Sequence, residues 1–219
     1  MDAILQWGVD LIVSIQTIRT PVLDYFFITV TAGGSHIFFM LMLTLLYWCV
    51  DRTLGARAIA LFLFSTWTNS VTKNMFNQPR PYHLNPSVRV ASTGGPGLPS
   101  GHAQGMVVVW GYLAWGIKKR WFTITAIALI LLVSFSRLYV GVHFPTDILG
   151  GWVLGLALLA LFAPTIEPLE ERIFRMPAKT RLALCLALPP LFSLLYCGPW
   201  TIMPMGVLSG FLAGLLVSW

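Results

Sequence analysis

Long apolar runs separated by short polar connections dominate the chain. The clearest runs are residues 35–50, 56–71, 103–117, 121–136, 148–163 and 182–197. Each is slightly shorter than the roughly 20 residues with which an α-helix crosses a bilayer, and a few flanking residues make up the difference. We therefore predict six membrane-spanning helices whose weakly polar residues face one another inside a bundle.

The two ends of the chain have weaker patterns. Residues 2–19 include Asp2, Asp10 and Arg19 but repeat apolar residues at helical spacing, which predicts a helix that lies in the membrane interface. No positively charged segment precedes its apolar part, so the pattern is not that of a signal peptide. Residues 207–219 are apolar but too few to cross a bilayer alone, and they predict a partial seventh helix or the start of a longer one.

Composition agrees with this pattern. Of the 219 residues, 57% are hydrophobic and only 10% are charged, whereas a soluble globular chain has about 25% charged residues. We predict an all-α fold, a polytopic membrane helix bundle with a six-helix core and an N-terminal interfacial helix. We expect residues 1–219 to form a single membrane-embedded domain, in which residues 165–219 supply a C-terminal connector and helices. The charged segment 165–181 is predicted to be solvated.

The net charge of +6 is explained by membrane topology rather than by nucleic-acid binding. If the six helices alternate in direction, nine of the fourteen basic residues fall on one side, namely Arg52, Arg57, Lys118, Lys119, Arg120, Arg172, Arg175, Lys179 and Arg181. The positive-inside rule makes that side cytoplasmic. The three cysteines, Cys49, Cys185 and Cys197, lack metal-ligand spacing and are expected to be small core residues.

Three segments of the chain carry most of the remaining polar chemistry. "KNMFNQPRPY" (73–82) and "GGPGLPSGH" (94–102) follow the second predicted span, and "SRLYVGVHFPTD" (136–147) follows the fourth. Loops after the second and fourth spans open on the same, non-cytoplasmic side. We therefore expect six reactive side chains to converge there: Lys73, Arg80, His102, Arg137, His143 and Asp147.

The first two segments suit an anion site. Arg80 lies between two prolines, which stiffen the backbone that carries a guanidinium able to bind phosphate oxygens bidentately. Ser100 is placed to cap the third span, and Gly101 lets a ligand approach the free N–H groups of the helix start. Each residue also has a simpler interpretation when it is considered alone. Lys73 could extend to the lipid headgroups, Arg80 could be an ordinary turn residue, and Ser100 and Gly101 could only cap the helix.

The third segment suits a nucleophile. Asp147 follows His143 by four residues and can accept a hydrogen bond from one ring nitrogen, which leaves the other nitrogen with a lone pair. An interfacial His–Asp pair at a helix start is the alternative. The positive charges of Lys73, Arg80 and Arg137 and the negative charge of Asp147 sum to a net charge of +2. This charge would balance the charge of about −1.5 to −2 on a phosphate monoester. Two histidines and one aspartate among cations do not predict a metal site.

The order and spacing of these residues resemble a family signature. They are similar to the tripartite signature of the type-2 phosphatidic-acid phosphatase superfamily. The first part corresponds to Lys73, Arg80 and Pro81, and the second to Pro99, Ser100, Gly101 and His102. The third part corresponds to Ser136, Arg137, His143 and Asp147. That superfamily includes bacterial phosphatidylglycerophosphate and undecaprenyl-pyrophosphate phosphatases and, more remotely, vanadium haloperoxidases. The resemblance covers about residues 35–164.

The resemblance implies a membrane phosphatase that hydrolyses lipid phosphate or pyrophosphate esters without a metal or cofactor. His143 would attack phosphorus and form a phosphohistidine, Asp147 would orient His143, and His102 would protonate the departing oxygen. The phosphate oxygens would be held by Lys73, Arg80, Ser100, Gly101 and Arg137. We expect a phosphorylated lipid and the bilayer as partners, no nucleic acid, and a site on the non-cytoplasmic side of the cell membrane.

Two other functions are compatible with the sequence. A phosphotransferase would pass the phosphoryl group to a lipid or sugar acceptor, and a transporter would bind a phosphorylated anion without cleaving it. A transporter has no need of His102 or of the His143–Asp147 pair. Residues 82–98 are expected to roof the site. Gln78, His83 and Arg89 either contact a lipid headgroup or a second phosphate, or are solvated loop residues.

Overall fold

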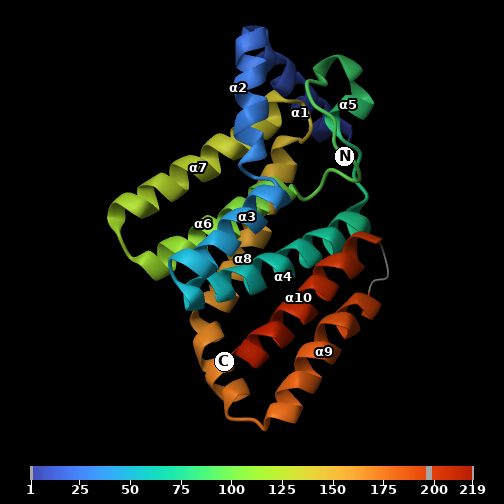
Figure 1. The fold of residues 1–219 in the computed structure, drawn as a ribbon. Helices are drawn as coiled ribbons and strands as arrows, with labels where there is room; N and C mark the ends of the chain where they lie inside the picture. The colour runs from blue at the N-terminus through green and yellow to red at the C-terminus, as the bar shows by residue number, and fades with distance from the viewer. Residues whose placement is uncertain (1, 196–198, 219) are drawn as a thin grey trace.

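Every regular element is a helix in the part of the chain that the computed structural model describes, residues 2–195 and 199–218 (Figure 1). All six predicted apolar runs are helical. They form α3 (His36–Cys49), α4 (Arg52–Phe76), α6 (Gly101–Ile117), α7 (Arg120–Tyr139), α8 (Pro145–Phe174) and α9 (Ala178–Leu195). The end of the last predicted run and Cys197 lie outside the described residues. The predicted all-α class is confirmed.

Fewer helices qualify as membrane spans by length and hydropathy than the six predicted. Within the described residues, α7 and α8 are long and apolar enough, and α2 (Pro21–Ala32) with α3 qualifies as one span bent by 50°. α6 has only 17 residues, and α4 carries a polar stripe. Ser65 and Asn69 of this stripe are buried against Gln104 of α6, with hydrogen bonds of 2.8 and 2.7 Å. Polar groups that pair inside a bundle lower the hydropathy of a helix that faces its neighbours.

Helix α2 precedes the first predicted span and is absent from the sequence prediction. Thr20 caps it, because its hydroxyl accepts from Leu23 N at 3.2 Å, and a proline occupies the first helical position. The helix packs on α7, where the rings of Phe27 and Tyr139 lie 4.3 Å apart. The Tyr139 hydroxyl also donates to Asp24 at 2.9 Å. This packing holds α2 against the end of α7.

The N-terminal helix α1 (Asp2–Ile15) lies at the same end of the bundle as α5 (Pro81–Leu84) (Figure 1). Its residues Leu5 and Val9 are buried in a cluster with Phe144. In the 3-10 turn η1 (Gln16–Ile18) that follows, Gln16 donates to Tyr139 O at 2.7 Å and to the carbonyl of Val88 at 2.8 Å. The N-terminal segment thereby ties the loop before α6 to the connection between α7 and α8. Val88 belongs to a second 3-10 turn of that loop, η2 (Pro86–Val88).

The core lies between α4, α6 and α8, and a C-terminal hairpin of α9 and α10 (Pro199–Ser218) packs on α4 (Figure 1). α10 begins earlier than the predicted partial helix 207–219. Residues 165–174, predicted as part of a solvated connector, continue α8 instead. Glu167 and Glu170 on this extension each form a 2.7 Å ion pair with Arg57 of α4, which gives the charged residues a helical partner.

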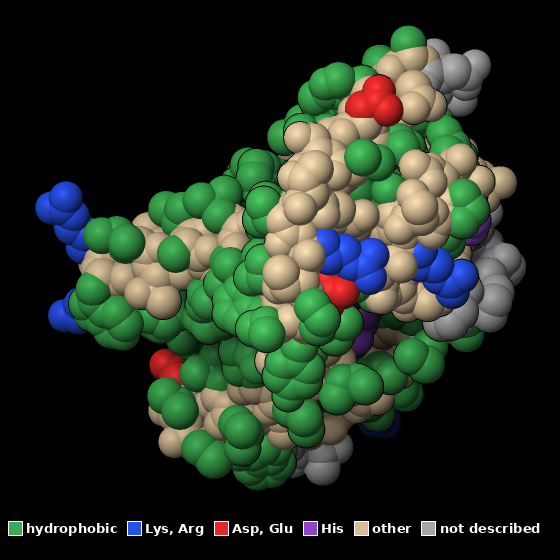
Figure 2. All heavy atoms as spheres, turned by 90° about the horizontal axis from the view of Figure 1, so that it is seen from above, with side chains coloured by type: hydrophobic (Ala, Val, Ile, Leu, Met, Phe, Trp, Pro, Cys, Tyr) green, Lys and Arg blue, Asp and Glu red, His purple; other side chains and the backbone are tan. Residues whose placement is uncertain are grey.

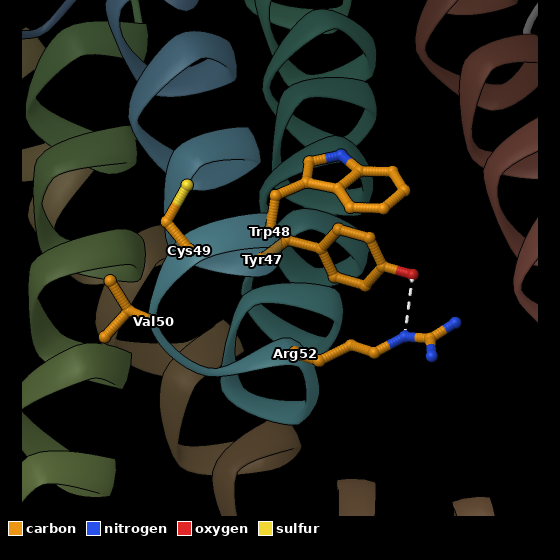
Figure 3. Close-up of a pocket in the computed structure, with 5 residues that line it drawn as sticks. All are labelled: Tyr47, Trp48, Cys49, Val50 and Arg52. Atoms are coloured by element: carbon orange, nitrogen blue, oxygen red, sulfur yellow. Dashed lines mark hydrogen bonds between the residues drawn. The ribbon is translucent and has the colours of Figure 1, made fainter.

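The turn between α3 and α4 forms an open hollow of about 600 Å³. Figure 3 shows the five residues that line it, Tyr47, Trp48, Cys49, Val50 and Arg52. Arg52 Nε donates to the Tyr47 hydroxyl at 3.1 Å, an arrangement of amphipathic side chains typical of a membrane interface. The hollow lies at the opposite end of α4 from Lys73, and no predicted site residue lines it.

Gly141 makes the sharp turn that leads from α7 towards α8. Its φ is +72°, in the left-handed region, and a Cβ at this position would overlap the backbone carbonyl of Val88. Both constraints require glycine. The turn places His143 two residues later at the start of α8.

Replacing Gly141 by Ala should lower the free energy of unfolding by at least about 2 kcal/mol, because the backbone is left-handed and the loop must shift. Gly206→Ala in α10 is the matched control, since a Cβ there meets nothing within 4 Å and alanine favours a helix by up to about 1 kcal/mol. Thermal unfolding in detergent measures both changes. A Gly141→Ala variant as stable as the parent protein would refute this role of the turn.

Candidate active site

Three segments that are distant in sequence meet at one end of the bundle. They are the end of α4 with the loop that follows, the start of α6, and the α7–α8 connection (Figure 1). Ser100 N donates to Asp147 O at 2.9 Å, and Arg80 Nη1 donates to Val142 O at 2.9 Å. Figure 2 shows this end of the molecule from outside, with a few basic side chains among many hydrophobic ones; Arg80, Arg137 and His143 are buried beneath this surface. The structure thus brings the three predicted segments together.

His143 and Asp147 form a buried, aligned pair at the start of α8. His143 Nδ1 lies 3.0 Å from Asp147 Oδ2, and both side chains are almost fully buried. The other ring nitrogen, Nε2, lies 3.3 Å from Arg80 Nη1. A guanidinium only donates and an ionised carboxylate only accepts, so these contacts assign the proton to Nδ1 and the lone pair to Nε2.

Burial and positive neighbours keep the His143 imidazole neutral. Desolvation lowers the pKa of His143 well below its usual value, and the charges of Arg137 and Lys73 lower it further. Arg80 and His102 act in the same direction. These four side chains come from the three predicted segments, and all of them act on one imidazole. A neutral imidazole with a free lone pair is the nucleophilic form.

Four consecutive backbone carbonyls hold two of the predicted cations, and we call this segment, residues 94–97, the carbonyl strap. Lys73 Nζ donates to two of these oxygens, at 2.7 and 3.1 Å. The Arg80 guanidinium donates to the other two, at 2.8 and 2.9 Å. Because carbonyl oxygens are neutral, the strap fixes both side chains without cancelling their charge.

Arg137, near the end of α7, is buried with a single neutral partner. Its Nη1 donates to the Thr31 hydroxyl of α2. Its Nε has no hydrogen-bond partner among the residues that the structure describes, although Arg137 is only 4% exposed. Among the described residues, no carboxylate forms an ion pair with Arg137, Arg80 or Lys73. Buried cations without a counter-charge are costly, and a bound anion would supply that charge.

Ser100 and Gly101 begin α6. The Ser100 hydroxyl is fully buried and accepts from Ala103 N at 3.4 Å, which makes Ser100 the predicted N-cap. Gly101 has a packing role as well, since a Cβ there would lie 3.0 Å from Asn69 Oδ1 on α4. The close approach of α4 therefore requires a small residue at 101 whether or not a ligand is bound.

His102 follows in the first turn of α6 and is half-buried. It lies beside the break between α2 and α3, where a Cβ on Gly34 would be 3.0 Å from His102 Cδ2. No hydrogen bond found between described residues uses the His102 imidazole. Within the described residues, neither of its ring nitrogens is thus occupied by a hydrogen-bond partner.

Gln78, His83 and Arg89, for which the sequence left two interpretations open, differ in where their side chains lie. His83 and Arg89 are exposed and bond to groups of their own loop. Gln78 does not reach outward: its Nε2 donates to Asp147 Oδ1 at 2.7 Å. Gln78 and Thr31 are the two residues of this site that sequence analysis did not assign to it.

The chemistry of the donor set favours an anion. Within residues 2–195 and 199–218, no three side chains of histidine, cysteine, aspartate or glutamate are grouped to hold a metal ion. The site offers two imidazoles and one carboxylate, and three cations surround them. Such a set can hold a tetrahedral oxyanion beside a nucleophilic nitrogen.

Curated relatives of this chain are membrane-lipid phosphatases by name. "Lipid phosphate phosphatase delta" of Arabidopsis thaliana is 29% identical over 184 residues, which cover 76% of this chain and 44% of that protein. "Phosphatidylglycerophosphatase B" of Bacillus subtilis (strain 168) is 33% identical over 132 residues, which cover 55% of this chain and 61% of that protein. The chain thus spans less than half of the first relative and about three fifths of the second.

A solved structure shares the fold. The first transmembrane PAP2 type phosphatidylglycerolphosphate phosphatase from Bacillus subtilis superposes with a TM-score of 0.65 at 24% identity, covering 81% of this chain and 90% of that one. The sequence model of the PAP2 superfamily matches residues 54–170, slightly more than half of the chain. This match includes every predicted site residue. The resemblance drawn from the three segments is confirmed, and the chain belongs to the PAP2 superfamily.

Proposed function

We propose that the protein is an integral-membrane phosphatase that hydrolyses lipid phosphate or pyrophosphate esters through a phosphohistidine, without a metal cofactor. One observation carries the proposal: three basic side chains without carboxylate partners surround an imidazole whose Nε2 is unprotonated. The names of the relatives support the lipid substrate class. The apolar helices support a multi-pass location in the membrane.

Phosphate binding uses the excess charge of the site. Lys73, Arg80 and Arg137 contact the non-bridging oxygens, and their surplus of +2 over the one carboxylate balances a charge of about −1.5 to −2. The Ser100 hydroxyl and the Gly101 N–H add donors at the start of α6. Because Arg80 Nη1 is already 3.3 Å from the His143 Nε2, a phosphate bound to Arg80 lies next to the nucleophile.

The reaction has two steps. His143 Nε2 attacks phosphorus and forms a P–N bond while the P–O bond to the lipid breaks, and His102 in its imidazolium form gives its proton to the departing oxygen. Asp147 accepts from Nδ1–H throughout and stabilises the positive charge that develops on the ring. Water then attacks phosphorus, His102 takes a proton from that water, and the P–N bond breaks to release phosphate and neutral His143.

The site is assigned to the non-cytoplasmic face of the cell membrane on the basis of charge. Nine of the fourteen basic residues lie in the turns α3–α4, α6–α7 and α8–α9 or in the helix ends that flank these turns. The catalytic segments lie at the other ends of these helices, so the positive-inside rule supports an outward-facing site. A lipid substrate reaches such a site from the outer leaflet.

Replacing His143 by Ala should lower the rate of phosphate release by about 10³-fold or more, because the nucleophile is lost. The assay uses purified protein in detergent, a long-chain lipid phosphate and EDTA throughout. His83→Asn is the matched control, since it removes an exposed imidazole but keeps an acceptor for Arg80 N. Full turnover by the His143→Ala variant, or complete loss of parent activity in EDTA, would rule out the mechanism.

Replacing His102 by Asn should affect substrates according to their leaving group. An alkoxide leaves poorly without an acid, so hydrolysis of an alkyl phosphate should fall by about 10²- to 10⁴-fold. A nitrophenolate leaves unaided, so formation of the phosphoenzyme from p-nitrophenyl phosphate should fall much less. Pre-steady-state release of nitrophenol measures that step. Equal losses with both substrates would show that His102 is not the general acid.

Acidification should destabilise the ligand-free protein through His143. Because the folded-state pKa is lowered, the unfolded chain takes up the proton first as the pH falls below about 6.5, and the free energy of unfolding decreases. Chemical unfolding between pH 8 and pH 5 measures the slope. The His143→Gln variant, which cannot titrate at this position, should show a shallower slope. Identical slopes would contradict a neutral, buried His143.

A further inference from the structure

The Asp147 carboxylate is buried and receives three hydrogen bonds. Its Oδ2 accepts from His143 Nδ1 and from Phe144 N, each at 3.0 Å. Its Oδ1 accepts from Gln78 Nε2 at 2.7 Å, the shortest of the three contacts. A carboxylate only accepts, so the amide of Gln78 must present its NH₂ group. The catalytic pair is thus extended to a chain of three side chains.

The backbone around Gln78 is fixed on both sides. Asn77 ends α4 in the left-handed conformation, with a φ of 42°, and Pro79 restricts the residue before it. The carbonyl of Gln78 accepts from Gly97 N in the carbonyl strap at 2.8 Å. With its backbone held in this way, Gln78 directs its side chain inward to Asp147.

Gln78 Nε2 is the one hydrogen-bond donor to Asp147 Oδ1 among the described residues. A Cβ on Gly97 would lie 2.9 Å from Asp147 Oδ2, so the carbonyl strap packs against the carboxylate, which is fully buried. Without Gln78, Oδ1 would be a buried acceptor with no donor, a state that proteins avoid. The carboxylate would relieve that loss by rotating about its Cβ–Cγ bond, and Oδ2 would then leave the His143 N–H.

We propose that Gln78 is a positioning residue for the phosphohistidine reaction: its amide fixes Asp147 Oδ1, so that Oδ2 holds His143 in the nucleophilic tautomer. This inference rests on the proposed function. Gln78 touches neither the reacting phosphorus nor His143. It acts through Asp147 alone, so its loss slows the chemical step and leaves phosphate binding by Lys73, Arg80 and Arg137 in place.

Two substitutions test the contact. Gln78→Leu removes the donor and should lower kcat by about tenfold to a hundredfold, with KM nearly unchanged. Gln78→Glu keeps the length of the side chain and places a second carboxylate against Asp147, where the two charges repel unless the introduced carboxyl group is protonated. In its protonated form that group donates an O–H to Oδ1, as the amide does. Asn77→Gly is the control, because Asn77 is exposed and its left-handed backbone accepts glycine.

The pH dependence separates positioning from a merely structural role. The charged and titratable groups near Asp147 are Lys73 from α4, Arg80 from the loop and His143 from the α7–α8 connection, and all three are the same in both variants. The ratio of the kcat of Gln78→Glu to that of Gln78→Leu therefore reports only the residue at 78. We expect this ratio to rise as the pH falls from about 8 to about 5.

Each outcome has a defined meaning. Parent-like kcat in Gln78→Leu, a rise in KM alone, or a ratio that does not change with pH would overturn the inference, provided that His143→Ala is inactive in the same assay. A fully active His143→Ala variant would overturn the proposed function and this inference with it. Gln78→Glu remains informative if Gln78→Leu does not fold, because its kcat relative to the parent should then rise with acidification.

Discussion

Uncompensated positive charge is the constraint on which this end of the protein depends. Lys73, Arg80 and Arg137 converge on one imidazole with a single carboxylate among them. Like charges a few ångströms apart repel by a few kcal/mol even at an effective dielectric constant of about 20. The bundle holds them apart with neutral groups, the carbonyl strap and the Thr31 hydroxyl. Under the proposed function, a bound phosphate would supply the negative charge that these three cations lack.

The ends of three helices carry the groups of this site. α4 delivers a lysine at its C-terminus, α6 presents its N-terminal N–H groups, and α8 begins with the aspartate that orients His143. The tight packing of these ends explains the glycines. Gly101 lies against Asn69 of α4, and Gly151 of α8 lies so close to the start of α6 that a Cβ would be 2.6 Å from Ser100 O. Preorganisation of this kind keeps donors aimed at the place where charge develops.

The sequence predicted the parts of the site that local chemistry determines. Proline, glycine and serine at fixed spacing mark helix ends, and alternation of helix direction was enough to place His102 and His143 on one side. Contacts that depend on side-chain direction were not predictable. Gln78 was grouped with His83 and Arg89 because the sequence does not show which group a side-chain amide will bond to. The dipeptide Thr20-Pro21 was the available signal for α2, but without that helix nothing linked Thr31 to Arg137. Ser65 and Asn69 of α4 face the bundle interior, as predicted for weakly polar residues of the apolar runs. They also lower the hydropathy of α4, which is not among the helices that qualify as spans by length and hydropathy.

A covalent intermediate on His143 distinguishes the proposed mechanism from direct attack by water. The stereochemistry at phosphorus separates the two mechanisms whether or not the intermediate accumulates. A lipid phosphate made chiral with oxygen isotopes and sulfur is hydrolysed in isotopically labelled water, and the configuration of the released thiophosphate is determined. Attack by His143 followed by attack by water inverts the configuration at phosphorus twice, so we expect net retention. Net inversion would show that water attacks the substrate directly and would contradict the phosphohistidine.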